Sequence, residues 1–267
     1  LVRSRGLGDV YKRQHEANAL PGVSNRMVAQ KVDKFLLAVP EAEKHLPQRQ
    51  DYIVTGNPVR PEILAADRAA ARARLGVRPG QLCLLSFGGS LGAQTINEAV
   101  AALMAWHVPE GKLHHIHATG RYGVELLPRL LREKGVAYEN NPNLDIREYI
   151  HDMPDCLAAA DLVIARAGAI TLAELTAVGR ASVLIPSPNV AENHQYHNAM
   201  VLANHKAAVV IEEKDLTGEK LVAAVKEMTA DPEKLREISL AAKALGVPNA
   251  CGHITDELLD LYKTHRK

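Results

Sequence analysis

The sequence predicts an α/β fold built on a doubly wound parallel sheet. From Leu82 onward, short apolar runs alternate with amphipathic helical segments, and turns that contain glycine separate them. The runs CLLSF, LVIA and SVLIP are apolar throughout, which is typical of strands that helices cover on both faces. Of the 267 residues 47% are hydrophobic, which fills the core of one large domain or of one and a half.

The elements expected after residue 60 follow this alternation. The expected strands are Leu82–Phe87, His114–Ala118, Leu144–Tyr149, Asp161–Ala165, Ala181–Pro186 and Ala208–Glu212. The helices expected between them are Gln94–His107, Gly123–Lys134, Met153–Ala160, Ile170–Val178 and Asn193–His205. Further helices are expected at Pro61–Arg78, with its arginines in water, at Gly218–Ala230 and Pro232–Leu245, and after Gly246, with Ile254, Leu258, Leu261 and Tyr262 as an apolar stripe.

The residues before this sheet predict the end of an earlier α/β unit. Lys34–Val39 and Tyr52–Thr55 are expected as strands, and His15–Gln30 belongs with them. Residues 1–14 show neither helical nor strand periodicity, and we interpret them as a non-native leader.

Charge and cysteine content narrow the class of protein. With 32 basic and 31 acidic side chains the net charge is +1, which gives no electrostatic footprint for nucleic acid. The three cysteines are scattered without CxxC spacing, which favours a reducing compartment over a disulfide framework or a zinc site. No apolar run approaches the roughly 20 residues that span a bilayer, which leaves peripheral membrane contact open.

Two turns between an expected strand and an expected helix could hold a phosphate. Gly88, Gly89 and Ser90 lie in the first, and Arg166–Thr171 forms the second. Glycine lets the backbone approach a ligand, and the free N–H groups at a helix start favour an anion. Each turn alone is equally explained by tight strand-to-helix packing, but two at the same sheet edge could converge on a pyrophosphate.

Several polar side chains near these turns have two interpretations each. Glu174 could accept hydrogen bonds from ribose hydroxyls or merely complement the helix dipole. His194, Gln195 and Asn198 can share a helix face suited to sugar hydroxyls, while the alternative of a metal site lacks a third ligand. Arg60 could bind phosphate or form a surface ion pair.

Six segments together resemble the MurG family of UDP-N-acetylglucosamine:undecaprenyl-pyrophosphoryl-N-acetylmuramoyl-pentapeptide N-acetylglucosaminyltransferases. They are HEAN at His15–Asn18, TGNPVR at Thr55–Arg60, FGGSLGA at Phe87–Ala93, YIHDMP at Tyr149–Pro154, RAGAITLAE at Arg166–Glu174 and ENHQYHNA at Glu192–Ala199. Ala17 stands where that family commonly has glutamine, and the family's GGTGGH-type loop does not occur in these 267 residues.

The resemblance implies a two-domain GT-B architecture and a role for each matching residue. The diphosphate would meet the backbone of Gly88 and Gly89, Ser90, and the turn residues Ala169, Ile170 and Thr171, with Arg60 nearby. The backbone of Ile150 would read the uracil, Glu174 the ribose, and His194, Gln195 and Asn198 the sugar, with Asn18 also at the substrate. The general base stays unassigned; His15 and Glu16 are only neighbours of the expected catalytic site.

The resemblance also implies a domain division and partners. The chain would comprise the leader 1–14, a remnant 15–55 of an acceptor-binding domain, a donor-binding domain 56–246, and a helix 247–267 that packs back toward the N-terminal domain. Its partners would be UDP-N-acetylglucosamine, the lipid-linked muramoyl-pentapeptide and, in the full-length protein, the cytoplasmic membrane surface, with no cofactor, metal or nucleic acid. A binding module without catalysis and a UDP-sugar 2-epimerase are the alternatives.

Overall fold

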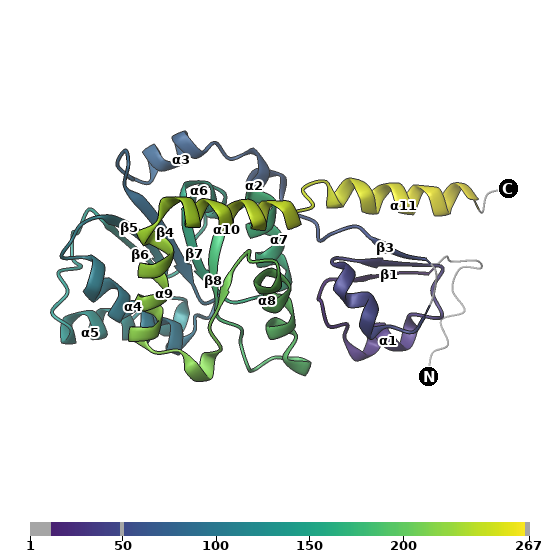
Figure 1. Cartoon of the computed structure of the whole chain (residues 1–267), viewed down its shortest axis with the longest axis horizontal. Helices are drawn as coiled ribbons and strands as arrows, with labels where there is room; N and C mark the ends of the chain where they lie inside the picture. Colours follow the sequence, from purple (N-terminus) through teal and green to yellow (C-terminus); the bar gives the residue numbers. More distant parts are fainter. Residues whose placement is uncertain (1–11, 49–50, 265–267) are drawn as a thin grey trace.

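The computed structural model describes residues 12–48 and 51–264 (Figure 1). These residues form two parallel sheets, a small one of three strands and a large one of six. The small sheet has the order β1-β2-β3, with β1 at Arg13–Glu16, β2 at Lys34–Leu37 and β3 at Tyr52–Val54. Arg13 and Gln14, which we assigned to the leader, therefore pair with β2.

The large sheet has the strand order β6-β5-β4-β7-β8-β9. Its strands are β4 (Leu82–Phe87), β5 (Leu113–Ala118), β6 (Leu144–Arg147), β7 (Leu162–Ala165), β8 (Ala181–Leu184) and β9 (Val209–Val210). The chain runs outward from β4 through β5 to β6 and then crosses back to β7 on the other side of β4. The predicted doubly wound parallel sheet is confirmed, and its topological switch point lies between β4 and β7.

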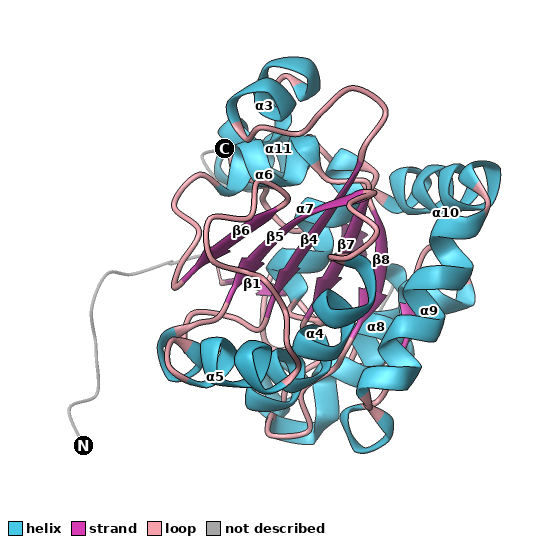
Figure 2. Ribbon diagram, turned by 90° about the vertical axis from the view of Figure 1, so that its left-hand side faces the viewer, coloured by secondary structure: helices cyan, strands magenta, loops and turns pink. Residues whose placement is uncertain are grey.

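Helices cover both faces of the large sheet (Figure 2). One face packs against α4 (Gln94–His107), α5 (Leu126–Glu133) and α9 (Gly218–Ala230) through a core that includes Leu84 and Ile164. The other face packs against α6 (Met153–Ala159), α7 (Ala169–Val178) and α8 (His194–Asn204) through a core that includes Leu85 and Val163. Adjacent residues of one strand thus enter opposite cores, as the pleat of a strand requires.

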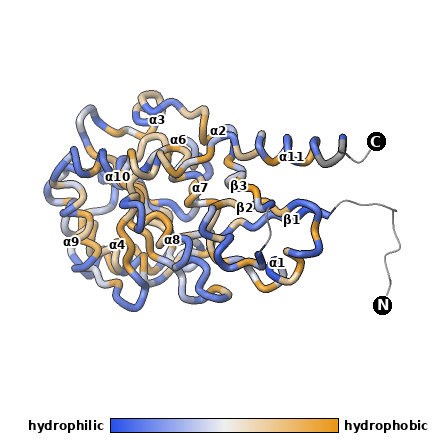
Figure 3. The backbone as a smooth tube through the Cα atoms, turned by 45° about the vertical axis from the view of Figure 1, so that its right-hand side comes forward, coloured by the Kyte–Doolittle hydropathy of each residue, from blue (hydrophilic) through white to orange (hydrophobic). Residues whose placement is uncertain are grey.

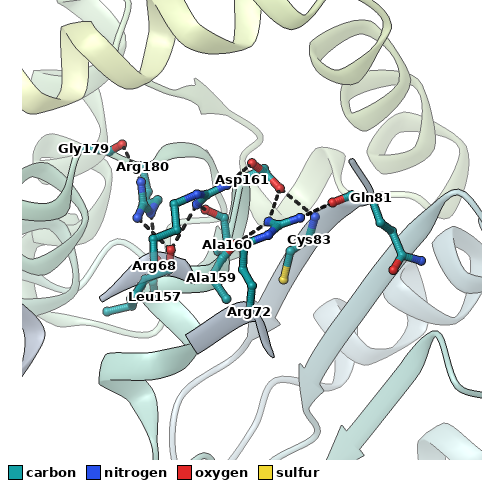
Figure 4. Close-up of polar contacts among 11 residues, drawn as sticks. Arg68, Arg72, Gln81, Cys83, Leu157, Ala159, Ala160, Asp161, Gly179 and Arg180 are labelled. Atoms are coloured by element: carbon teal, nitrogen blue, oxygen red, sulfur yellow. Dashed lines mark hydrogen bonds and ion pairs between the residues drawn. The ribbon is translucent and has the colours of Figure 1, made fainter. Parts of the chain in front are cut away.

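The arginine-rich segment differs from the single solvated helix that we expected. It forms α2 (Pro61–Ala65) and α3 (Arg68–Arg74), and Asp67 caps α3 by accepting from the Ala70 amide at 2.7 Å. Arg68 and Arg72 bind backbone carbonyls at the end of α6 and the Asp161 carboxylate, and Arg180 donates to one of the same carbonyls, that of Ala158 (Figure 4). The arginines satisfy carbonyls that a helix C-terminus leaves unpaired, which a count of charges along the sequence does not reveal.

The last two helices lead from the large sheet to the small one. The first of them is α10 (Pro232–Leu245), and α11 (Ala250–Thr264) extends from it alongside the small sheet (Figure 1). Lys34 of β2 donates to Glu257 at 2.6 Å and to Asp260 at 3.2 Å. Hydrophilic and hydrophobic residues alternate along α11 (Figure 3). The exact domain boundaries stay a prediction.

The remaining connections near the N-terminus are short. Helix α1 (Val23–Val28) joins β1 to β2, and a 3₁₀ helix at Pro40–His45 precedes β3. Within residues 12–48 and 51–264, no helix has both the length and the apolar character needed to cross a lipid bilayer.

Candidate functional site

The first turn with candidate site residues joins β4 to α4. A Cβ atom on Gly88 would lie 2.7 Å from the backbone nitrogen of Ala93, closer than atoms tolerate. Gly89 has a φ of +97°, a backbone conformation that residues with side chains rarely adopt. Ser90 is exposed. The shape of the turn thus requires the two glycines, and the serine side chain is accessible to a ligand.

A turn at the end of β5 packs against this first turn. Gly92 has a φ of +81°, and a Cβ atom on it would lie 2.2 Å from the carbonyl oxygen of Thr119. A Cβ atom on Gly120 would in turn lie 2.0 Å from the Gly92 nitrogen. The amide of Tyr122 donates to the carbonyl of Leu91 at 3.1 Å. Backbone packed directly on backbone holds the first turn in place.

The second turn joins β7 to α7 and lies beside the first. Phe87 and Ala165, the last residues of β4 and β7, are register partners in the sheet, so both turns begin at the same edge. The N-cap residues of the two helices, Ala93 and Gly168, provide no side-chain cap. The unpaired amides and positive ends of α4 and α7 are therefore both available at the switch point.

The residues of the second turn are placed where a ligand can reach them. Ile170 is half exposed, and Ala169 and Thr171 are partly exposed. Among the described residues, none accepts a hydrogen bond from the amides of these first three residues of α7. These N–H groups are donors that an anion can satisfy.

Arg60 and Glu174, which we considered separately in the sequence, form one ion pair. Glu174 Oε1 accepts from Arg60 Nε at 3.1 Å and from Nη2 at 3.0 Å. The Glu174 side chain is 11% exposed and that of Arg60 is 55% exposed. No described residue donates to the second oxygen, Oε2. The arginine thus orients the carboxylate, and its own exposure leaves room for it to meet an anion as well.

Ile150 lies in the loop between β6 and α6 and is 5% exposed. Among the described residues, neither its backbone N–H nor its carbonyl has a hydrogen-bond partner. A backbone donor and acceptor that lie side by side on one residue match the donor and acceptor groups on the edge of a nucleobase, which is the contact that the resemblance implies. Contact of Ile150 with a base stays a prediction.

The three polar residues of α8 differ in their surroundings. His194 Nδ1 lies 2.9 Å from the carbonyl of Ala191, and Gln195 Oε1 accepts from the amide of Ser187 at 2.9 Å. Both side chains are partly exposed, whereas Asn198 is 4% exposed. A sugar can therefore approach His194 and Gln195 more easily than it can approach Asn198.

Asn198 instead connects α8 to the loop that follows β1. Its Oδ1 accepts from the amide of Ala19 at 2.8 Å, and its Nδ2 donates to Asn18 Oδ1 at 3.0 Å. Asn18 in turn donates to Glu16. Asn198 is thus held at both its oxygen and its nitrogen, and a substrate contact by Asn18 or Asn198 stays a prediction.

Glu16 and His15, which we expected to lie near the catalytic site, already have hydrogen-bond partners within the chain. Both carboxylate oxygens of Glu16 accept hydrogen bonds, Oε1 from Asn18 and Oε2 from Gly22 and Asn25, and the residue is 2% exposed. His15 Nε2 lies 3.0 Å from the carbonyl of Gly56. Glu16 thus stabilises the loop that follows β1. Beside it, Ala17 lines a cavity of about 160 Å³ at the place where the resembling family has glutamine.

Two polar networks near the turns were missed in the sequence. Glu213 binds Arg166 and Thr95 at once, which links the second turn to the start of α4. A buried chain of hydrogen bonds runs from His107 through His115, Ser86 and His117 to Asn97. Asn97 then donates to the carbonyl of Thr119 at 3.0 Å, beside the first turn. The histidine-rich strand LHHIHA was the only trace of the second network in the sequence.

Comparison with known proteins identifies the family. Residues 83–253 match the glycosyltransferase family 28 C-terminal domain. The UDP-N-acetylglucosamine--N-acetylmuramyl-(pentapeptide) pyrophosphoryl-undecaprenol N-acetylglucosamine transferase of Desulforudis audaxviator is 43% identical over 96% of this chain and 69% of its own length. The enzyme of the same name from Desulforamulus reducens is 41% identical over 90% of this chain and 64% of its own length. The chain thus spans about two thirds of these relatives.

Solved structures agree with this assignment. The crystal structure of Acinetobacter baumannii MurG has a TM-score of 0.72 and 27% identity, over 93% of this chain and 67% of that one. A putative UDP-N-acetylglucosamine 2-epimerase from Listeria monocytogenes has a TM-score of 0.68 at 14% identity, over 94% of this chain and 68% of that one, a likeness of fold alone. The chain therefore belongs to glycosyltransferase family 28, among the MurG N-acetylglucosaminyltransferases.

Proposed function

We propose that this chain is the donor-binding part of an inverting transferase that moves N-acetylglucosamine from UDP-N-acetylglucosamine to a lipid-linked muramoyl-pentapeptide in peptidoglycan synthesis. One observation carries the proposal. Helices α4 and α7 both begin, without a side-chain cap, at the carboxyl ends of the neighbouring strands β4 and β7. Open α/β sheets bind ligands at this switch point, and two helix N-termini there suit a diphosphate.

The other parts of the donor follow from the positions around the turns. Ser90 and the amides of Ala169, Ile170 and Thr171 bind the diphosphate, with Arg60 close to it. The free oxygen of Glu174 accepts a ribose hydroxyl, and the unpaired backbone groups of Ile150 bind the uracil edge. His194 and Gln195 reach the sugar.

In the complete enzyme, the acceptor hydroxyl attacks the anomeric carbon while the bond from that carbon to UDP breaks on the opposite face. The hydroxyl proton passes to a general base, and negative charge grows on the leaving diphosphate. Preorganised N–H groups stabilise that charge, and removal of one such donor in comparable sites costs about 2.7–4 kcal/mol of transition-state stabilisation. A base remains unassigned in this chain, so we propose that it binds the donor without turnover on its own.

The complete protein would work peripherally at the cytoplasmic face of the bacterial plasma membrane. The relatives are named for a pyrophosphoryl-undecaprenol acceptor, and a hydrocarbon chain of that kind partitions into a bilayer. A peripheral enzyme can reach the polar head of such an acceptor from the water side.

Calorimetric titration of the purified chain with UDP-N-acetylglucosamine tests the proposal. We expect saturable binding that UDP displaces and that GDP does not. A parallel assay follows the donor by chromatography with a lipid-linked acceptor present. The absence of binding would refute the donor site, and turnover by the chain alone would refute the restriction to binding. Conversion to UDP-N-acetylmannosamine would identify a 2-epimerase instead.

A further inference from the structure

Glu213 connects the two turns of the candidate site from a third element. It begins the short 3₁₀ helix Glu213–Asp215, which follows β9. Its Oε1 accepts from the hydroxyl of Thr95 at 2.8 Å, and its Oε2 pairs with Arg166 Nη1. Thr95 belongs to the first turn of α4, and Arg166 follows β7 directly. One carboxylate thus bridges the two segments that flank the switch point.

The bridge is largely shielded from water. The side chains of Arg166 and Glu213 are 15% and 16% exposed. Burial raises the pKa of Glu213, but the hydrogen bonds from Arg166 and Thr95 outweigh it and hold that pKa below its ordinary value. Ion pairs and charge-assisted hydrogen bonds are stronger where water is excluded, so this contact fixes geometry better than an exposed pair does.

Arg166 keeps donors to spare. All its side-chain hydrogen bonds to described residues come from Nη1, which also donates to the carbonyls of Ile185 at 3.2 Å and Pro186 at 3.4 Å. Its Nε and Nη2 have no acceptor among the described residues, and neither nitrogen is fully buried. These N–H groups therefore reach solvent, on a residue three positions before the start of α7. A planar guanidinium held at one nitrogen can offer the others to a phosphate.

We propose that Glu213 is a positioning residue, which holds the two turns at the spacing that a diphosphate needs and turns the free N–H groups of Arg166 toward it. This inference rests on the proposed function. Glu213 itself does not touch the ligand, since a carboxylate would repel it. The effect passes through Arg166 on one side and Thr95 on the other.

The substitution Glu213→Gln distinguishes a positioning role from a purely electrostatic effect, because the two change the affinity for UDP in opposite directions. A glutamine removes one negative charge near an anion site, so electrostatics alone would tighten the binding of UDP. Loss of positioning would weaken it, by about tenfold for one charge-assisted hydrogen bond. Because uridine has no diphosphate, its affinity should not change. Glu212→Gln is the matched control, since Glu212 carries the same charge one residue away and pairs with the exposed Lys214 at 3.1 Å.

The measurement is calorimetric titration of wild type and variants with UDP and uridine. We expect Glu213→Gln to bind UDP more weakly than wild type does and to bind uridine equally well. Thr95→Val should show a smaller loss of affinity for UDP, and Thr95→Ser and Glu212→Gln should bind UDP like wild type. Unchanged or tighter binding of UDP by Glu213→Gln would overturn the inference and leave the donor site standing, as would an equal loss of UDP and uridine. Failure of the wild type to bind UDP would overturn both.

Discussion

At the scale of single residues, the pairing of Arg60 with Glu174 changes how each is understood. The sequence allowed a phosphate contact for the first and a ribose contact for the second, each beside a simpler alternative. The structure joins them through Glu174 Oε1, so the carboxylate is oriented and its Oε2 is left for a ligand. A carboxylate that merely complements a helix dipole needs no such partner.

The substitution Glu174→Ala tests the ribose contact. We expect the affinity for UDP to fall about tenfold, because a hydroxyl loses an ionised acceptor. Wild type should prefer UDP to 2′,3′-dideoxy-UDP, and the variant should bind the two equally in calorimetric titrations. A variant that keeps the full preference for UDP would show that the ribose hydroxyls bind elsewhere.

At the scale of elements, hydrophobic periodicity predicted most of the large sheet. The strand Leu82–Phe87 and the helices Gln94–His107 and Pro232–Leu245 begin and end where the sequence placed them. The prediction of one solvated helix at Pro61–Arg78 was wrong. Asp67 caps a second helix there, and Arg68 and Arg72 bind carbonyls far along the chain. Contacts of that kind depend on tertiary structure, which a local pattern does not contain.

The candidate site divides in the same way. Glycines between an expected strand and an expected helix pointed to both turns, and the backbone requires glycine in the first of them, at Gly88 and Gly89. At Gly168 in the second turn the backbone is extended and a Cβ atom would fit. The bridge through Glu213 could not be found, since Thr95, Arg166 and Glu213 are distant in sequence and each is an ordinary surface residue type.

The buried histidines between α4, β5 and β4 make stability depend on pH. Burial lowers the pKa of His117 to about 3 and that of His107 to about 4, and it also lowers that of His115. Between about pH 4 and pH 6.5 the unfolded chain protonates these side chains, whereas the folded chain keeps them neutral. The free energy of unfolding should therefore fall as the pH drops below about 6.5, by about 1.4 kcal/mol per pH unit for each histidine.

Urea denaturation between pH 5 and pH 7 measures this slope. We expect His117→Gln to reduce the slope by the share of one histidine, and the exposed His253→Gln to leave it unchanged. An equal slope in wild type and His117→Gln would show that this histidine is protonated in the folded state as well.

At the scale of the whole molecule, the small sheet is attached to the large unit by specific polar contacts. Asn198 bonds to Asn18 and Ala19, Arg26 pairs with Glu192 at 2.5 Å, and Lys34 pairs with α11. The proposed diphosphate, ribose, base and sugar contacts all lie between Arg60 and Asn204, at the turns after β4 and β7, at Ile150 after β6, at Arg60 and on α7 and α8. Donor binding should accordingly be a property of this chain without further segments.

The proposed donor site requires one diphosphate to be shared by the turns after β4 and β7, and a crystal structure of the chain with UDP tests this most directly. We expect the diphosphate oxygens within hydrogen-bond distance of Ser90 and of the amides of Ala169, Ile170 or Thr171 in the same complex. A diphosphate that contacts only one of the two turns, or a nucleotide bound away from the switch point, would contradict the account.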